Sequence, residues 1–292
     1  MKVLRSQSRY GSHAFDILNI VVLGLVSLLT VLPFIHIVVA SFTLPEILAK
    51  SDFVLFPSRL SLEGYAYVFS TNVVIRSLVV STFITIVGTY FSVIMAVLMA
   101  YPLAHKGLTG RKLLMLMVIF TIMFNGGLVP TYIIVQKLHL LNTYMSLILP
   151  GAISVFSLVI FKSYFQELPA ELEESAKLDG YNDLMILFKI ILPSSKPLLA
   201  TFTVMFGVTY WNTWFNAVIY LNDPKMWPVQ LVLRQVMSSS SQIGDMVESA
   251  SLIQPKTIQM CVITIATFPI LCAYPFLQKY FSQGMLLGSV KG

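Results

Sequence analysis

The sequence predicts an all-α protein that crosses a membrane several times. Of its 292 residues, 57% are hydrophobic and only 11% are charged, whereas soluble domains carry about 25% charged residues. The mean hydropathy is +0.81. Because so few charges cannot cover a water-exposed surface, and because the apolar residues gather in long runs, we expect most of the chain to lie in lipid.

Six apolar runs are long enough to cross a bilayer, which takes about 20 mostly apolar residues in a helix. They cover residues 17–41, 78–103, 113–135, 147–164, 198–221 and 258–281. The first run exceeds the roughly 7–15 apolar residues of a cleaved signal sequence, so we expect it to persist as a transmembrane helix. The pattern predicts one transmembrane domain over residues 1–292.

The distribution of Lys and Arg predicts the orientation, because cytoplasmic loops carry an excess of these residues. With the N-terminus inside, twelve of them fall on the inner side and seven on the outer side. The short loop at 105–112 holds Lys106, Arg111 and Lys112. We therefore expect both termini in the cytoplasm, and we assign the net charge of +6 to inner loops and lipid rather than to nucleic acid.

The sequence lacks features that are typical of ion-coupled transporters and of several classes of enzyme. No Asp or Glu lies in the middle of a predicted span, whereas ion-coupled transporters usually keep ionisable groups there. This argues against ion coupling, although backbone carbonyls of broken helices can also hold Na⁺. No phosphate-binding loop, zinc-protease motif or nucleophile elbow is found. We expect no catalytic residue and no metal site in this chain. If the chain moves a solute uphill, the energy must therefore come from another subunit.

A patterned polar loop, residues 165–196, separates the fourth and fifth predicted spans. Pro169 suits the first turn of a helix, and the acidic residues that follow it suit the positive end of the helix dipole. Gly180 is a natural helix stop, because glycine accepts a positive φ. Asn182 or Asp183 can then cap a second helix. The loop therefore predicts a short helix, a tight turn and a second helix, which Pro193 and Pro197 end before the next span.

The same loop resembles the signature loop of binding-protein-dependent ABC importer permeases. That signature reads Glu-Ala-Ala, three residues, Gly, nine residues, Ile-x-Leu-Pro. Here it is matched by Glu174-Ser175-Ala176, Gly180 and Ile190-Ile191-Leu192-Pro193. The one departure is Ser175, a small residue in place of another small residue. An amphipathic helix lying on the bilayer is the alternative, but such helices favour basic residues, and this one begins with acidic residues.

Further segments resemble the carbohydrate-uptake branch of these permeases, the maltose-type family, and within it the permeases for oligosaccharides and polysaccharide fragments. They are residues 124–132, 141–143, 149–151, 211–212 and 288–292. The resemblance implies a type I ABC importer permease fold that moves a carbohydrate, an oligosaccharide, by alternating access in the cell membrane of a prokaryote. A permease for another solute is the main alternative, and an ion-coupled secondary transporter is a more distant one.

The resemblance also implies partners. These are a second, homologous permease, two ATPase subunits that hold ATP and Mg²⁺, and an extracytoplasmic solute-binding protein, often a lipoprotein. The loop would dock into a cleft of the ATPase, and the C-terminal residues would reach between the two ATPases; a frayed terminus is the alternative. The residues implied in ATPase coupling are Glu171, Glu174, Ser175, Ala176, Asp179, Gly180, Leu192, Pro193, Lys291 and Gly292.

Candidate sugar contacts lie in the fifth predicted span, where amides and aromatic rings are spaced about one helical turn apart. Amides bond sugar hydroxyls, and aromatic rings offer flat apolar faces to sugar C–H groups. Polar side chains in lipid must face protein or a cavity, so we expect this stripe to face inward. Interhelical packing is the competing interpretation. The predicted contacts, with one at the end of the third span, are Tyr210, Trp211, Asn212, Trp214, Asn216 and Asn125.

Overall fold

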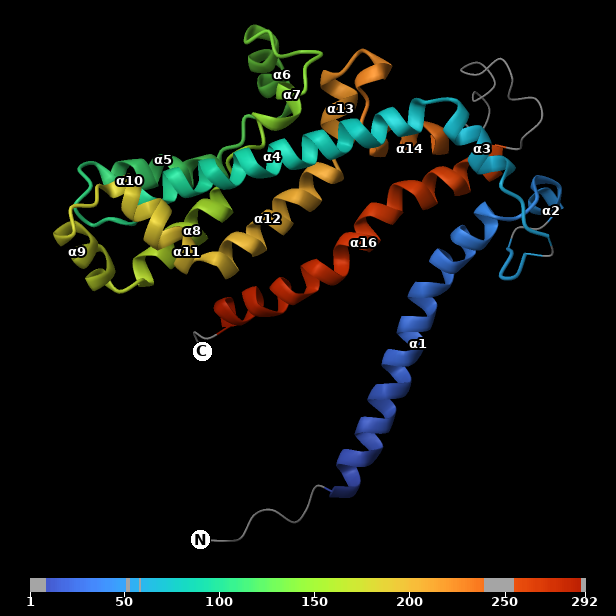
Figure 1. The fold of residues 1–292 in the computed structure, drawn as a ribbon, viewed down its shortest axis with the longest axis horizontal. Helices are drawn as coiled ribbons and strands as arrows, with labels where there is room; N and C mark the ends of the chain where they lie inside the picture. Colours follow the sequence, from blue (N-terminus) through green and yellow to red (C-terminus); the bar gives the residue numbers. More distant parts are fainter. Residues whose placement is uncertain (1–8, 51–52, 58, 239–254, 290–292) are drawn as a thin grey trace. The chain divides into compact units, whose positions relative to one another are not determined.

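The structure is a computed structural model that describes residues 9–50, 53–57, 59–238 and 255–289. Over these ranges the chain is helical, with one isolated β-bridge between Thr43 and Leu60 (Figure 1). The all-α prediction is confirmed for the described residues. The chain forms two compact units, one of Met1–Thr71 with Val236–Ile265 and one of Asn72–Gln235 with Ala266–Gly292.

The first unit holds α1, α2, α3 and the start of α16. The bounds are α1 (Arg9–Ser41), α2 (Pro45–Lys50), α3 (Glu63–Ser70) and α16 (Pro255–Ser289). Ser41 and Tyr65 share a hydrogen bond of 2.7 Å between their hydroxyls. A Cβ built on Gly64 would lie 2.8 Å from the Cys261 Sγ, so only glycine allows α3 and α16 to approach this closely.

The second unit is built around α4 (Val73–Ala104), which packs against α8 and α12. Its other elements are α5 (Arg111–Met123), α6 (Leu128–Lys137), α7 (Met145–Ile148), α8 (Val155–Glu167), α9 (Ala170–Leu178), α10 (Asp183–Ile186), a π-helical turn η1 (Leu187–Ile191), α11 (Leu192–Ser194), α12 (Lys196–Trp211), α13 (Phe215–Tyr220), a 3₁₀ turn η2 (Pro224–Met226) and most of α14 (Val229–Ser238). The core of this unit is apolar, and Ile84, Leu158 and Phe161 are fully buried in it.

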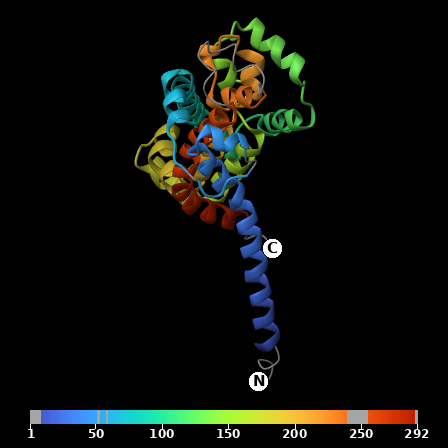
Figure 2. The same cartoon turned by 90° about the vertical axis from the view of Figure 1, so that its right-hand side faces the viewer.

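The third predicted span, residues 113–135, is not one straight helix. It consists of α5 and α6, which are bent by 118° relative to one another and drawn in green in Figure 2. The break falls at Asn125-Gly126-Gly127, where Gly127 has φ +82° and the Asn125 Oδ1 accepts a hydrogen bond from the Gly127 N–H at 2.9 Å. Side-chain competition for backbone N–H groups and a positive φ both end helices.

The fourth and fifth predicted spans also differ from single long helices. In the fourth, 147–164, the short α7 is followed by non-helical residues and then by α8, whose 13 residues span only about 20 Å at 1.5 Å per residue. In the fifth, 198–221, α12 ends at Trp211 and α13 begins at Phe215. These breaks were not predicted, because each stretch is mostly apolar along its whole length.

Within the part of the chain that the structure describes, three helices are long and apolar enough to cross a membrane, namely Phe15–Ser41, Val73–Ala104 and Pro255–Cys272. The count rises to five if each of two bent pairs is one span, α5 with α6 and Asp183–Ser194 with α12. Their apolar side chains are widely exposed, as at Ile20 (70%) and Leu116 (67%). Such exposure fits a lipid environment rather than water.

Candidate functional site

The helix α9 forms the first half of the polar loop, and its end is built as the sequence predicts. Gly180 has φ +81°. The Tyr181 N–H donates to the Ala176 carbonyl at 3.0 Å, and the Gly180 N–H donates to the Lys177 carbonyl at 3.1 Å. This pair of bonds is the Schellman motif, which satisfies the last carbonyls of a helix and requires the left-handed conformation. Pro169 precedes the helix as its N-cap residue rather than lying in its first turn.

The second half of the loop begins at Asn182, whose Oδ1 accepts a hydrogen bond from the Met185 N–H at 2.8 Å. Of the two predicted caps, Asn182 is therefore the one in place. The helix continues through the π-turn η1 to Ser194, and the chain then bends by 85° into α12. This bend falls at Ser195, between Pro193 in α11 and Pro197 in the first turn of α12. Leu192 and Pro193 thus lie directly before the corner that joins the loop to the fifth predicted span.

Most of the predicted coupling residues point outward. The exposed ones are Glu171, Glu174, Ser175, Asp179, Gly180 and Pro193. Ala176 does not fit the prediction of a small surface patch, because it is only 3% exposed and belongs to the core of its unit. Ala176 shares a face of α9 with Glu173, because residues three apart lie on the same side of a helix. This face packs inward. Ser175 alone of the two small residues is available to a partner.

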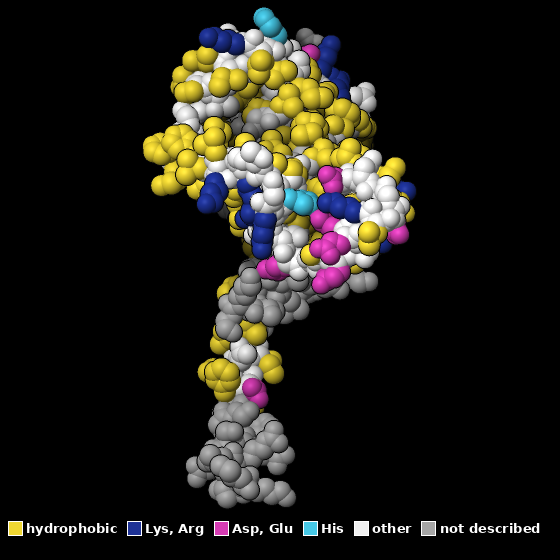
Figure 3. Space-filling view, turned by 90° about the vertical axis from the view of Figure 1, so that its left-hand side faces the viewer, with side chains coloured by type: hydrophobic (Ala, Val, Ile, Leu, Met, Phe, Trp, Pro, Cys, Tyr) yellow, Lys and Arg dark blue, Asp and Glu magenta, His cyan; other side chains and the backbone are white. Residues whose placement is uncertain are grey.

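The loop also exposes large apolar side chains outside the predicted spans. Leu178 is 90% exposed, Leu184 60% and Phe188 53%. Figure 3 looks onto the end of the second unit that carries α9 and α10, and apolar side chains are mixed there with acidic and basic ones. We call Leu178, Leu184 and Phe188 the apolar loop surface. Exposed apolar groups rimmed by charges are typical of protein–protein contact sites.

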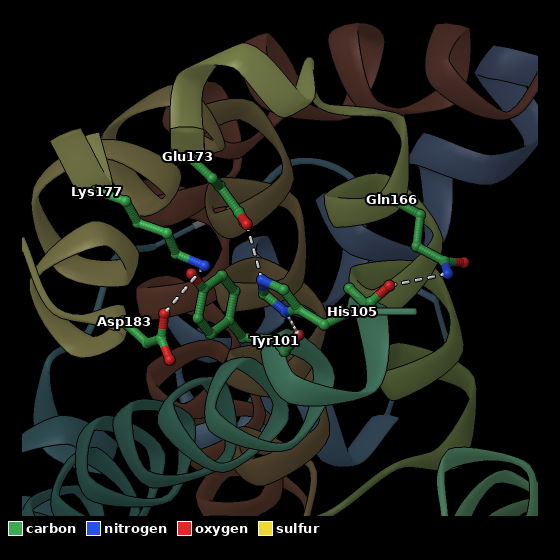
Figure 4. Close-up of polar contacts among 7 residues, drawn as sticks. Tyr101, His105, Gln166, Glu173, Lys177 and Asp183 are labelled. Atoms are coloured by element: carbon green, nitrogen blue, oxygen red, sulfur yellow. Dashed lines mark hydrogen bonds and ion pairs between the residues drawn. The ribbon is translucent and has the colours of Figure 1, made fainter. Parts of the chain in front are cut away.

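Polar side chains connect the loop to the C-terminal end of α4 (Figure 4). His105 Nε2 lies 2.8 Å from Glu173 Oε2, and His105 Nδ1 lies 2.9 Å from the Tyr101 carbonyl oxygen. Two further side chains satisfy the last carbonyls of α4, because Gln166 donates to Ala104 and Arg111 donates to Leu103. These bonds give α9 and α4 a defined mutual position.

The predicted sugar contacts do not form one stripe, because the helix is broken between Asn212 and Trp214. Tyr210 and Trp211 are buried, whereas Asn212 and Asn216 are exposed. The Tyr210 hydroxyl bonds the Ser92 hydroxyl at 2.8 Å. These side chains therefore do not all share one surface, since Tyr210 and Trp211 are buried within the second unit.

The other predicted contacts have separate surroundings. The Asn212 amide donates to the Val208 carbonyl at 2.8 Å and so caps its own helix. Trp214 lies beneath the Arg234 guanidinium, whose Cζ is 3.7 Å from the ring centroid. Asn125 is exposed at the break between α5 and α6. Lys291 and Gly292 lie outside the described residues.

An open pocket of about 210 Å³ does bring some of the predicted residues together. Tyr210 and Asn216 line it with Thr209 and Thr213, and Phe156 supplies an aromatic ring. Hydroxyl and amide groups beside an aromatic face are the groups that a sugar requires. The two threonines were not among the predicted contacts, although they are four residues apart and Thr213 lies three residues before Asn216.

Two further residues of the site, His105 and Leu178, were not predicted. His105 is a lone histidine after an apolar run, and a lone histidine forms no recognisable pattern. Leu178 was not predicted because it occupies one of the three unspecified positions of the signature, between Ala176 and Gly180. Both become evident only when the turn at Gly180 places α9 beside the end of α4.

The comparisons with known proteins agree with this geometry. Residues 85–287 match the family described as binding-protein-dependent transport system inner membrane component. Two relatives in Bacillus subtilis cover nearly the whole chain. The polygalacturonan/rhamnogalacturonan transport system permease protein YtcP is 50% identical, with 96% of this chain and 99% of that protein covered. Protein LplC is 49% identical, with 97% and 96% covered.

A solved structure is similar over the same extent. One chain of a bacterial ABC transporter involved in the import of the acidic polysaccharide alginate superposes with a TM-score of 0.88 at 27% identity. The alignment covers 96% of this chain and all of that one. The family resemblance that the loop motif predicted is thereby confirmed. The chain belongs to the family of binding-protein-dependent transport system inner membrane components.

Proposed function

We propose that this chain is a membrane-spanning permease subunit of an ATP-driven importer for oligosaccharides, and that the loop from α9 to α11 docks onto the ATPase subunit. The observation that carries the proposal is the loop itself. Its signature residues form a helix ended by a Schellman turn at Gly180, and it presents the apolar loop surface beyond the predicted spans. A loop in contact with water alone gains nothing from exposing Leu178.

The substrates of the relatives favour fragments of acidic polysaccharides. One relative is named for polygalacturonan and rhamnogalacturonan transport, and the structural neighbour belongs to an alginate importer. We propose that this chain carries oligosaccharides that contain uronic acids. The pocket beside Tyr210 and Asn216 is proposed as part of their path, because it offers hydroxyl, amide and aromatic groups together.

The proposed topology has six spans with both termini in the cytoplasm. It uses α1, α4, the α5–α6 pair, α8, the α12–α13 pair and α16. The excess of Lys and Arg on the side of the 105–112 loop supports this orientation. The loop from α9 to α11 then lies in the cytoplasm, where an ATPase is available. The chain would form one permease domain.

The proposed assembly contains a second, related permease, two ATPase subunits that bind ATP and Mg²⁺, and a solute-binding protein outside the cell. This chain holds no catalytic role in the proposal. ATP binding closes the ATPase pair, the loop carries that movement to α4 and α12, and the spans alternate between inward and outward openings.

The test is purification of the tagged chain in mild detergent from the cells that naturally produce it, followed by an ATPase assay and an uptake assay in liposomes. We expect an ATPase and a second permease to co-purify, with ATP-dependent uptake of oligogalacturonides. Transport driven by an ion gradient without ATP would overturn the proposal.

A further inference from the structure

The contact between His105 and Glu173 joins two elements that are 68 residues apart in sequence. His105 is the C-cap residue of α4, and Glu173 lies in the first turn of α9. Their side chains are 31% and 24% exposed, so water screens the pair less than it would a fully exposed one. The pair therefore links the proposed ATPase-docking helix directly to the central helix of the second unit.

The geometry favours the cationic form of the imidazole ring. Nδ1 faces the Tyr101 carbonyl oxygen at 2.9 Å and Nε2 faces a Glu173 carboxylate oxygen at 2.8 Å. Both partners are acceptors, and a neutral ring has only one N–H to donate. The doubly protonated ring satisfies both, so the contact is a charge-assisted hydrogen bond.

Both charges are also placed favourably with respect to the helices that carry them. A cation at the C-terminus of α4 faces the negative end of that helix dipole, and an anion in the first turn of α9 faces the positive end of the other. The Tyr101 ring packs edge-on against the imidazole at 4.7 Å between centroids and limits its rotation. The other charged groups around this junction are Lys106, Arg111, Lys177 and Asp183.

The loop contains a second ion pair that does not reach α4. Lys177 Nζ lies 3.6 Å from Asp183 Oδ1, and the side chains are 53% and 73% exposed. This pair joins α9 to α10 within the loop, so it offers a control of the same chemistry (Figure 4). Exposed pairs of this kind contribute little.

We propose that His105 is a positioning residue for energy coupling, and that its ion pair with Glu173 transmits the movement of α9 to α4. The inference rests on the proposed function, because it requires α9 to follow the ATPase. Since α4 packs against both α8 and α12, a displacement of its cytoplasmic end reaches the core of the second unit. Without the ion pair, α9 can move while α4 lags behind.

The experiment measures sugar uptake and ATP hydrolysis in the same liposomes that contain the whole transporter with its binding protein. The variants are His105→Gln, Glu173→Gln and the double variant, with Asp183→Asn as the control. We expect each single variant to lower the sugar moved per ATP by about threefold to tenfold, a range typical of a half-buried charge-assisted bond. The double variant should be no worse than either single one, because both remove the same contact.

A further variant, His105→Lys, keeps a cation beside Glu173. It should move more sugar per ATP than His105→Gln does, a rescue that a residue with only a packing role would not show. Unchanged coupling in both single variants, additive losses in the double variant, or coupling in His105→Lys no better than in His105→Gln would each overturn the inference. Absence of an ATPase from the wild-type complex would instead overturn the proposed function.

Discussion

Tyr210 of α12 lies flat against the backbone of α4 at Gly88. A Cβ built on Gly88 would lie 2.8 Å from three atoms of the Tyr210 ring, while the Tyr210 hydroxyl bonds Ser92 at 2.8 Å and the Ile148 carbonyl at 3.2 Å. A residue that we expected to contact sugar thus holds three helices together, with its ring in the space that a glycine leaves open.

Gly88→Ala is expected to destabilise the protein, because the backbone of α4 and the buried Tyr210 ring cannot both keep their places. Overpacking of a close contact costs about 1–3 kcal/mol, and a lower melting temperature in detergent would show it. Gly24→Ala is the matched control, since nothing lies within 4 Å of its Cβ. Equal melting temperatures for the two variants would contradict the packing described for Gly88.

Gly180→Val is expected to abolish uptake while the chain still inserts in the membrane. A Cβ at this position meets nothing within 4 Å, so the damage comes from φ +81° alone. A left-handed conformation costs a residue other than glycine about 1–2 kcal/mol, and a β-branched side chain resists it further. The altered turn would misplace α9 and its apolar neighbours.

The control for that variant is Gly107→Val, in the loop after α4. Gly107 also has open space around it but has no positive φ. Uptake assays on membranes with matched amounts of each variant distinguish the two positions. Normal uptake by the Gly180 variant would show that the Schellman turn is not required for coupling.

Leu178→Asp is expected to weaken association with the ATPase by at least about tenfold, the loss typical of a central interface residue. Leu178 is 90% exposed, so its replacement leaves the fold intact. The measurement is the amount of ATPase retained by the tagged chain after a detergent wash. Leu62→Asp, at an exposed leucine ahead of α3, serves as the control and should retain the ATPase fully.

Asn216→Ala and Asn212→Ala should differ, although the two residues are alike in type and four positions apart. Asn216 lines the pocket beside Tyr210, so its loss should raise the half-saturating sugar concentration several-fold, as expected when about one hydrogen bond is removed. The Asn212 amide caps α12, so its loss should lower the melting temperature and leave the half-saturating concentration unchanged. The reverse result would place the sugar path elsewhere.

The helix end at Gly180 and the cap at Asn182 could be predicted for a physical reason. Gly180, Asn182 and the first-turn acids each act through local backbone geometry, so their roles can be read from a few neighbouring residues. Ala176 shows the limit of such reading, because the direction of its side chain depends on how α9 rests on the rest of the unit. His105 was missed for the same reason, since its partner Glu173 is remote in sequence.

The spans show a different limit. Hydropathy located the apolar runs but not the breaks within them, because a run stays apolar when a single amide such as Asn125 interrupts it. The Asn125 side chain accepts a hydrogen bond from the Gly127 N–H, and that competition for a backbone donor, rather than polarity averaged over a window, ends the helix. The interrupted fifth span is why the aromatic and amide residues did not share one face.

If the exposed end of α9 contacts an ATPase subunit, site-directed cross-linking from position 178 should capture that contact. Leu178→Cys would be introduced into a chain whose native Cys261 and Cys272 are replaced, and a short thiol-to-amine reagent would be applied to native membranes. We expect a cross-linked product of this chain with the ATPase, whose yield changes when ATP is added. Cross-linking at the control position Leu62→Cys but not at Leu178→Cys would show that the end of α9 does not contact the ATPase.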